Sequence, residues 1–410
     1  MAVAARMQRI QPFHVMALLA RARELEAAGR SVVHMEIGEP DFVTPQPVID
    51  AGHAALQAGL THYTPATGLP ELRRRIARHY LDRYALEIDP QRVVVTPGAS
   101  SALQLVLAAL VDPGSRVLLT DPGYPCNRNF VYLLNAEPVG MPVGADTAWQ
   151  PSVAQVREHW NADTSVLLLA SPSNPTGTLL DPASMHGYLE VVRAGGGTLV
   201  IDEIYHGLTY GPAVPTALSV SDEICVINSF SKYFGMTGWR LGWLVAPPAL
   251  VPELDKLAQN LFLAAPTLSQ HAALQAFEAP SIEILEQRRE CFRQRRDYLL
   301  PALRELGFGI PVAPDGAFYL YADCSRFTGD SFAFSQRLLE EVGVAITPGI
   351  DFGSHRAGEH VRFAYTTSLE NLQEGVRRLK AYLGGQVTTS TRDKPGIHRR
   401  DAENAKKKLK

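Results

Sequence analysis

Cysteine is scarce in this chain, with four widely separated residues among 410. They form no CxxC pair and match no zinc-ligand spacing, so we expect no metal site. Their positions also suggest no disulfide framework, which favours reduced thiols and a cytoplasmic location.

Long apolar runs are lacking as well. No stretch reaches transmembrane length, and the N-terminal "MAVAARMQRIQPFHVMALLARA" has no continuous apolar core of the signal-peptide kind. We therefore expect no membrane partner.

Charge of either sign is limited. Charged residues make up 20% of the chain and the formal net charge is −3, which gives no reason to expect a nucleic-acid partner. The C-terminus differs, because Arg392 to Lys410 holds eight Lys or Arg against three Asp or Glu. We interpret residues 386–410 as a basic, disordered tail.

A repeated strand–helix pattern occupies the region from about residue 90 to residue 250. Apolar runs end in polar or glycine-rich turns at "RVVVTPGAS", "SRVLLTDPGYP", "SVLLLASPSNPTG", "GTLVIDEIY" and "EICVINSFSK". Several runs are apolar throughout, which is typical of parallel strands covered on both faces. The pattern predicts an α/β fold with a large, doubly wound, mostly parallel sheet.

The pattern changes near residue 285. A charged helix is followed by three short strand segments, "GAFYLYADC", "GVAITPGIDFG" and "HVRFAYTT", which predict a smaller α+β domain. We expect an N-terminal arm over residues 1–45, a large domain over 46–284 and the small domain over 285–385.

Polar side chains follow the predicted strands of the large domain. Asn174, Asp202 and Lys232 each come shortly after an apolar run. In doubly wound sheets the ligand binds at the carboxyl ends of the strands. Asp202 is explained equally well as a cap for the next turn or as the partner of a pyridinium nitrogen.

The stretch "SFSKYFGMTGWRLGW" places Lys232 and Arg240 among glycine, methionine, threonine and aromatic residues. In such surroundings a lysine pKa falls and the amine becomes available for Schiff-base chemistry, although a solvated loop lysine is the commoner case. Arg240 with Ser229 would suit a phosphate. The glycine turn "TPGASSAL" opens a helix and suggests a second anion contact, but an ordinary N-cap by Ser100 accounts for it as well.

These residues belong to seven blocks that occur in a familiar order. The blocks are "EPDF", "THYTPATGLPELR", "NPTG", "DEIY", "SFSKYFGMTGWRLG", "TPGIDFG" and "VRFAYTTS". With them the chain resembles the fold-type I, class I/II pyridoxal-phosphate-dependent aminotransferases of the aspartate aminotransferase superfamily, over roughly residues 10 to 383.

The resemblance implies the pyridoxal-phosphate-dependent transferase fold, pyridoxal 5′-phosphate as cofactor, and catalytic roles for three residues. Lys232 would form the Schiff base and carry the substrate's α-proton. Asp202 would pair with the pyridine nitrogen. Tyr205, together with Asn174, would contact the phenolic oxygen of the ring.

The resemblance also implies a set of binding residues. Tyr124 would stack on the cofactor ring, and Arg362 would bind the substrate α-carboxylate, with Gly38 and Asn174 as further substrate contacts. Tyr63 would reach the phosphate of the neighbouring subunit, which implies a homodimer with shared sites. The remaining phosphate contacts would come from Gly98, Ala99, Ser100, Ser229 and Arg240.

The implied activity is transfer of an amino group from an L-amino acid to a 2-oxo acid by a ping-pong mechanism through pyridoxamine phosphate. A carbon–sulfur β-lyase or a cyclopropane-forming synthase on the same fold stays open, because fold does not decide reaction type. A ligand-sensing domain of a transcription regulator is disfavoured, because the stretch before Ile37 is too short for a winged-helix domain.

The chain departs from the family pattern in two places. One branch of aspartate aminotransferases has a lysine for the distal carboxylate in the turn where this chain has Ser100, which favours a neutral or aromatic donor. A phosphate-binding hydroxyl common near residue 265 is replaced by Ala264 and Ala265, and Thr267 is the candidate substitute.

Overall fold

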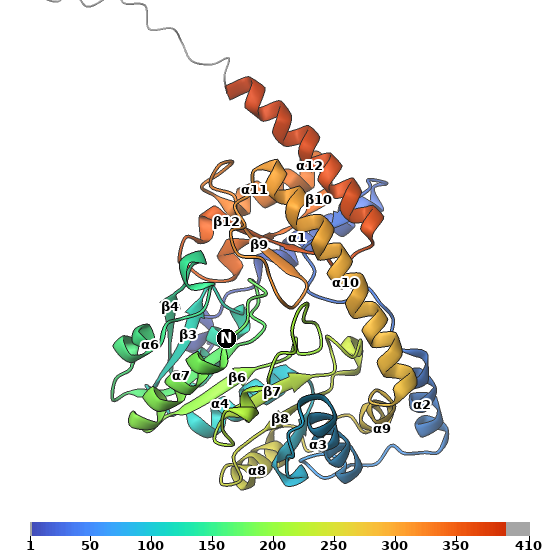
Figure 1. Ribbon diagram of the computed structural model, residues 1–410, viewed down its shortest axis with the longest axis vertical. Coiled ribbons are helices and arrows are strands. Elements are labelled where there is room, and N and C mark those ends of the chain that lie inside the picture. The colour runs from blue at the N-terminus through green and yellow to red at the C-terminus, as the bar shows by residue number, and fades with distance from the viewer. Residues whose placement is uncertain (1, 391–410) are drawn as a thin grey trace, which may run out of the picture.

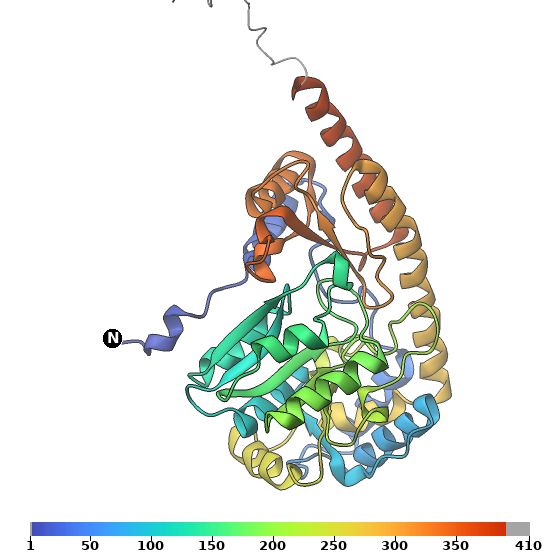
Figure 2. The ribbon, with the colours of Figure 1, turned by 60° about the vertical axis from the view of Figure 1, so that its left-hand side comes forward.

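The computed structural model describes residues 2–390, which form a large α/β part and a smaller α+β part (Figures 1 and 2). The large part is built on a seven-stranded sheet in the order β2-β8-β7-β6-β5-β3-β4. Its strands are β2 (Val93–Thr96), β3 (Arg116–Asp121), β4 (Glu137–Pro142), β5 (Thr164–Ala170), β6 (Thr198–Asp202), β7 (Cys225–Ser229) and β8 (Gly242–Val245). Only β8 runs antiparallel to its neighbours, which confirms the predicted mostly parallel sheet.

Both faces of this sheet are apolar because its strands are apolar at successive positions. In β5, Leu167 and Leu169 face one hydrophobic cluster while Val166 and Leu168 face the other. Helices therefore cover each face, as a doubly wound sheet requires. One face is covered by α4 (Ala99–Leu110), α5 (Pro125–Leu133) and α8 (Val251–Leu261). The other packs against α2 (Gln46–Gln57), α3 (Pro70–Tyr84), α6 (Val153–His159), α7 (Pro182–Ala194) and α9 (Thr267–Gln275).

Two strands of the sheet were not expected from the sequence. The edge strand β4 contains Pro138, Gly140 and Pro142, residues that weaken a strand reading and are tolerated at an edge. Strand β8 is short and follows the glycine-rich stretch around Arg240. Its place between β2 and β7 depends on pairing with distant segments, which local sequence does not reveal.

The smaller part contains the three segments expected to form strands, and all three do. Strands β9 (Tyr319–Asp323), β11 (Thr347–Pro348) and β12 (His360–Ala364) make an antiparallel sheet. Strand β10 (Val344–Ala345) pairs in parallel with β1 (Val33–His34). The N-terminal helix α1 (His14–Ala27) lies beside these strands with α11 (Ser331–Arg337) and α12 (Leu369–Ser390).

One long helix, α10 (Ala279–Leu306), runs along both parts (Figures 1 and 2). The expected domain boundary between residues 284 and 285 falls inside it. Helix α12 packs along α10 and continues to Ser390, past residue 386, where the basic tail was expected to begin. Residues 391–410 lie outside the described part of the chain.

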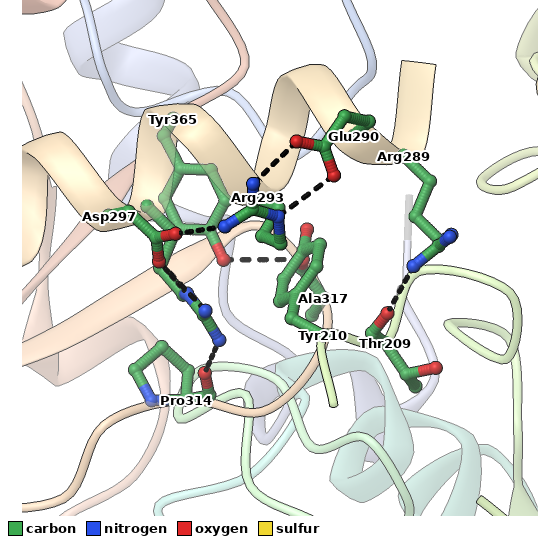
Figure 3. Close-up of polar contacts among 10 residues, drawn as sticks. Thr209, Tyr210, Arg289, Glu290, Arg293, Asp297, Pro314, Ala317 and Tyr365 are labelled. Carbon is green, nitrogen blue, oxygen red and sulfur yellow. Dashed lines mark hydrogen bonds and ion pairs between the residues drawn. The ribbon is translucent and has the colours of Figure 1, made fainter. Parts of the chain in front are cut away.

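Hydrogen bonds from α10 and from neighbouring segments fix the segment that leads into β9. Arg296 on α10 donates a 3.0 Å hydrogen bond to the carbonyl oxygen of Pro314. The hydroxyls of Tyr210 and Tyr365 both donate to the carbonyl oxygen of Ala317 (Figure 3). Ala317 has a φ of 58°, a left-handed conformation that the two hydroxyls support just before β9 begins.

Within residues 2–390, the helices lack the combination of length and apolarity needed to cross a bilayer. The same residues contain no group of three or more His, Cys, Asp or Glu side chains placed to hold a metal ion.

Candidate active site

The carboxyl ends of β5, β6 and β7 place three of the expected residues at one edge of the sheet. Asp202 is the last residue of β6, Asn174 follows β5, and Lys232 follows β7. Because these strands are parallel neighbours, their carboxyl ends meet there.

Lys232 lies at this carboxyl edge of the sheet. Its Nζ donates a 2.7 Å hydrogen bond to the carbonyl oxygen of Gly38. Burial lowers the pKa of Lys232 from its usual 10.5 to about 8. The charge of Glu39 opposes this shift, and the charges of Arg362 and Arg240 add to it. About half of the amine is therefore neutral at pH 8, and the neutral form is the one in which a lysine is nucleophilic and basic.

Asp202 is almost fully buried, and its Oδ1 accepts a 3.1 Å hydrogen bond from the backbone N of Ile204. It thus does cap the following turn. Burial also raises the pKa of Asp202 to about 7, because the carboxylate has lost its water. A cationic N–H placed against the carboxylate would restore its charge, which is the role expected of a pyridinium nitrogen.

Tyr205 meets a residue that the sequence did not single out. Its hydroxyl lies 2.9 Å from the hydroxyl of Tyr319, the first residue of β9, and both side chains are buried. A Cβ on Gly38 would lie 2.4 Å from the Tyr319 hydroxyl oxygen, so only glycine fits this approach. The sequence pattern of "GAFYLYADC" predicts only a strand, and nothing in it marks Tyr319 as a site residue.

Arg362 is buried in β12 and is held on several sides. Its Nη1 donates to Asn174 Oδ1 at 3.0 Å, and its Nη2 donates to the carbonyl oxygen of Glu36 at 2.7 Å and to Thr347 Oγ1 at 3.1 Å. The guanidinium lies 4.2 Å over the ring of Tyr319. Its Nε is buried and finds no partner among the described residues. An unpaired buried guanidinium N–H is costly, so this side of Arg362 fits a carboxylate from a ligand.

A second anion cradle lies at the start of α4. Gly98 has a φ of 81°, and a Cβ there would lie 2.7 Å from Nη2 of Arg240. Ala99 and Ser100 open the helix, where the first N–H groups have no carbonyl partner within the helix. Ser229, the last residue of β7, lies nearby, and its Oγ accepts a hydrogen bond from the backbone N of Ser231. The backbone donors, the guanidinium and the hydroxyl form the donor set that a phosphate requires.

The remaining predicted residues divide between the cavity and the surface. Tyr124 precedes α5 and lines the same cavity as Lys232. Tyr63 is 82% exposed and does not line that cavity. Thr267 donates a 2.7 Å hydrogen bond to the carbonyl oxygen of His62, so its hydroxyl is tied to the loop that carries Tyr63.

The cavity in front of Lys232 has a volume of about 200 Å³ and brings together six of the predicted residues. Those six are Gly38, Tyr124, Asn174, Tyr205, Lys232 and Arg362. It also contains residues that sequence reasoning missed: Phe13, Val15, Tyr319, Thr347, Asp351 and Phe352. The last three belong to the block "TPGIDFG", whose sequence pattern by itself indicates no role for any single residue.

The donor set fits pyridoxal 5′-phosphate. A lysine with a lowered pKa, a buried carboxylate with a raised pKa, and a phosphate cradle are present at one edge of the sheet. These are complementary to the aldehyde, the ring nitrogen and the phosphate of that cofactor.

The chain was compared with known proteins. Residues 30–379 match the family model described as aminotransferase class I and II. A valine–pyruvate aminotransferase of Mycobacterium tuberculosis is 39% identical over 379 residues, covering 92% of this chain and 97% of that protein. A (5-formylfuran-3-yl)methyl phosphate transaminase of Methanocaldococcus jannaschii is 36% identical over 381 residues, covering 92% and 98%.

The fold is similar to those of solved aminotransferase structures. An aspartate aminotransferase from Thermus thermophilus, solved with maleate, superposes with a TM-score of 0.88 at 33% identity, covering 93% of this chain and 99% of that one. The matches in sequence and fold, together with the donor set of the site, show that the chain belongs to the class I and II aminotransferase family and is a pyridoxal-5′-phosphate-dependent transaminase.

Proposed function

We propose that this enzyme moves the amino group of an L-amino acid to a 2-oxo acid by a ping-pong mechanism. The observation that carries the proposal is the buried Nε of Arg362, which has no partner among the described residues and belongs to a side chain lining the same cavity as the Lys232 amine. When bound, pyridoxal phosphate withdraws electrons from the substrate's α-carbon.

Arg362 orients the substrate. Its guanidinium is fixed by Asn174, Glu36 and Thr347, so it binds the α-carboxylate without first losing conformational freedom. An amino acid and a 2-oxo acid share this carboxylate, so one contact serves both halves of a ping-pong reaction. The aromatic ring of Tyr319 beneath the guanidinium excludes water from the contact.

Lys232 moves the proton. Its lowered pKa of about 8 allows the neutral amine to accept the α-proton near physiological pH, and the resulting ammonium would deliver a proton to the cofactor carbon that bears the aldehyde. The charges of Arg362 and Arg240 favour the neutral amine before the proton arrives. A surface lysine would stay protonated and could not act as a base.

Asp202, Tyr205 and Asn174 hold the cofactor ring in this proposal, and Tyr124 stacks on it. Gly98, Ala99, Ser100, Ser229 and Arg240 hold its phosphate. Burial raises the pKa of Asp202, so a cationic ring nitrogen beside it would stabilise the carboxylate and would itself stay protonated and electron-withdrawing.

We also propose a homodimer in which Tyr63 completes the site of the partner. Support comes from the 82% exposure of this tyrosine and from the neighbouring exposed Leu60, at 41%. Tyrosine is enriched at protein–protein interfaces relative to the rest of the surface. The free, buried thiols of Cys225 and Cys324 suit a reducing cytoplasmic setting.

The decisive experiment incubates the purified holoenzyme with a panel of L-amino acids and follows the visible absorbance of the bound cofactor. We expect stoichiometric loss of the band with a productive donor and its recovery on adding pyruvate or another 2-oxo acid. Release of ammonia and pyruvate without an acceptor would replace the proposal with a β-lyase. Lys232→Ala should lose both the native band and the turnover, and an unchanged band would refute the assignment of Lys232.

A further inference from the structure

Helix α1 begins without a capping side chain of its own. Phe13 is its N-cap residue and makes no side-chain cap. Instead, the carboxylate of Asp351 accepts hydrogen bonds from the backbone N of His14 at 2.8 Å and from that of Val15 at 2.9 Å. A carboxylate satisfies two free N–H groups and interacts favourably with the helix dipole, so Asp351 is the anchor of the start of α1.

Asp351 is itself held firmly. It ends the short helix η7 (Gly349–Asp351) and is buried. Its carbonyl oxygen accepts a 2.8 Å hydrogen bond from Nη2 of Arg128 on α5, and the carbonyl of Phe352 accepts one from the backbone N of Gly123 at 2.8 Å. The anchor is therefore tied to the large sheet domain through the segment around Tyr124, and α1 is placed relative to that segment.

The anchored start of α1 forms one wall of the cavity in front of Lys232. Phe13 and Val15, the neighbours of His14, line the cavity there together with Pro125, Ile204 and Phe352. This wall is apolar.

The charged residues that line the same cavity are Lys232, Arg362 and Asp351. In the proposed reaction Lys232 moves the proton and Arg362 binds the α-carboxylate. The third charged residue, Asp351, is negative. Among the described residues, the lining thus offers no further cation for an acidic side chain.

We propose that Asp351 is a positioning residue that holds Phe13 and Val15 as the side-chain pocket of the donor, and that this pocket selects amino acids with neutral, apolar side chains. The inference rests on the proposed aminotransferase function and deepens it. Each methylene that the pocket buries favours a donor by about fourfold. A donor with a second carboxylate brings that charge near Asp351 in a poorly solvated space and is disfavoured.

The test compares L-leucine, L-alanine and L-glutamate as donors for the holoenzyme. Alanine has no side chain beyond its Cβ and serves as the internal reference. We expect Phe13→Ala to lower kcat/KM for leucine about tenfold, mainly through KM, and to leave that for alanine within about twofold. Met16→Ala is the matched control, because Met16 lies on α1 and is 56% exposed.

Two substitutions test the anchor. Asp351→Asn keeps one acceptor oxygen but removes the charge, so it should raise the glutamate-to-leucine ratio of kcat/KM several-fold. Asp351→Ala removes both contacts to α1 and should lower the leucine-to-alanine ratio about as far as Phe13→Ala does. If Asp351→Ala does not fold, Asp351→Asn and Phe13→Ala carry the test.

A binding measurement gives a readout apart from turnover. α-Methylleucine and 2-methylalanine lack an α-proton, and their dissociation constants can be obtained from the cofactor absorbance. Phe13→Ala and Asp351→Ala should weaken α-methylleucine selectively. Unchanged leucine-to-alanine selectivity in both variants, or a wild-type preference for glutamate over leucine, would overturn the inference. Failure of every amino acid to convert the cofactor would instead overturn the proposed function, and the binding ratios would still decide the role of the pocket.

Discussion

Nη1 of Arg362 donates a 3.0 Å hydrogen bond to Oδ1 of Asn174. This contact joins β12 of the smaller part to the loop after β5 of the large sheet. Under the proposed function, the side chain that binds the substrate carboxylate is thus oriented by a residue that also contacts the cofactor ring. The proposed substrate and cofactor contacts belong to one hydrogen-bonded unit.

Replacing Arg362 with lysine should weaken every donor and acceptor alike. The lysine lacks the planar fork and the Nε–H, so charge-assisted hydrogen bonds worth about 3 kcal/mol are lost. That corresponds to a decrease in kcat/KM of roughly a hundredfold. Arg356→Lys is the control, since Arg356 is half exposed and pairs with Asp323 and Glu359. A loss confined to one donor would contradict a role in binding the shared α-carboxylate.

Gly38 and Tyr319 should show coupled effects. Gly38→Ala places a Cβ 2.4 Å from the Tyr319 hydroxyl oxygen and disturbs the carbonyl that accepts from Lys232, so we expect activity to fall at least tenfold. Tyr319→Phe removes the clashing oxygen. The double variant should therefore be more active than the product of the two single effects, as measured by a double-mutant cycle of kcat/KM. Strictly additive effects would show that the two residues do not meet in the active enzyme.

The lysine pKa can be read from the enzyme stripped of cofactor. Only neutral amine attacks an aldehyde, so the rate of cofactor attachment should rise with pH with a midpoint near pH 8, well below the usual lysine value of 10.5. Glu39 raises the pKa, so Glu39→Gln should shift the midpoint to lower pH. A midpoint near 10.5 would show that Lys232 is not buried as described.

His34 should make stability depend on pH. Its Nδ1 lies 2.7 Å from Oε1 of the buried Glu36, and this hydrogen bond is the main cause that raises the pKa of His34 from 6.5 to about 9. The folded state therefore binds more protons than the unfolded state between these values. The resulting stability is complete below pH 6.5 and is lost as the pH rises through about 9.

We accordingly expect His34→Gln to lower the free energy of unfolding most near pH 6 and least above pH 9. Chemical denaturation of the holoenzyme across this range is the measurement, with the exposed His53→Gln on α2 as control. A pH-independent loss would mean that the histidine contributes by packing alone.

Mixed dimers test whether Tyr63 acts across an interface. A heterodimer of a Lys232→Ala chain and a Tyr63→Ala chain holds one site with a native Lys232 and a native Tyr63, provided that the tyrosine reaches the partner's site. Co-expressed, differently tagged chains should then recover about half of the wild-type activity per dimer. No recovery, with dimers present, would place Tyr63 at its own chain's site, and a fully active Tyr63→Ala homodimer would place it outside any site.

Much of the architecture was predictable because it depends on local patterns. The runs that form β2, β3, β5, β6 and β7 are apolar at successive positions, and each ends in a turn. Polar residues after those runs must lie at one edge of a parallel sheet, so the grouping of Asp202 with Lys232 followed from the pattern. Strand β4 was missed because its prolines and glycine argue against a strand unless its edge position is known.

What the sequence by itself determined is therefore the class of fold, the edge that carries the chemistry and the residues suited to the cofactor. Only the tertiary structure decided the substrate side of the site. Asp351 meets the start of α1 across more than 330 residues of chain, and Tyr319 meets Gly38 and Tyr205 from a strand of the smaller sheet. Contacts between segments so far apart leave no period or spacing in the sequence, because each depends on how separately formed elements pack.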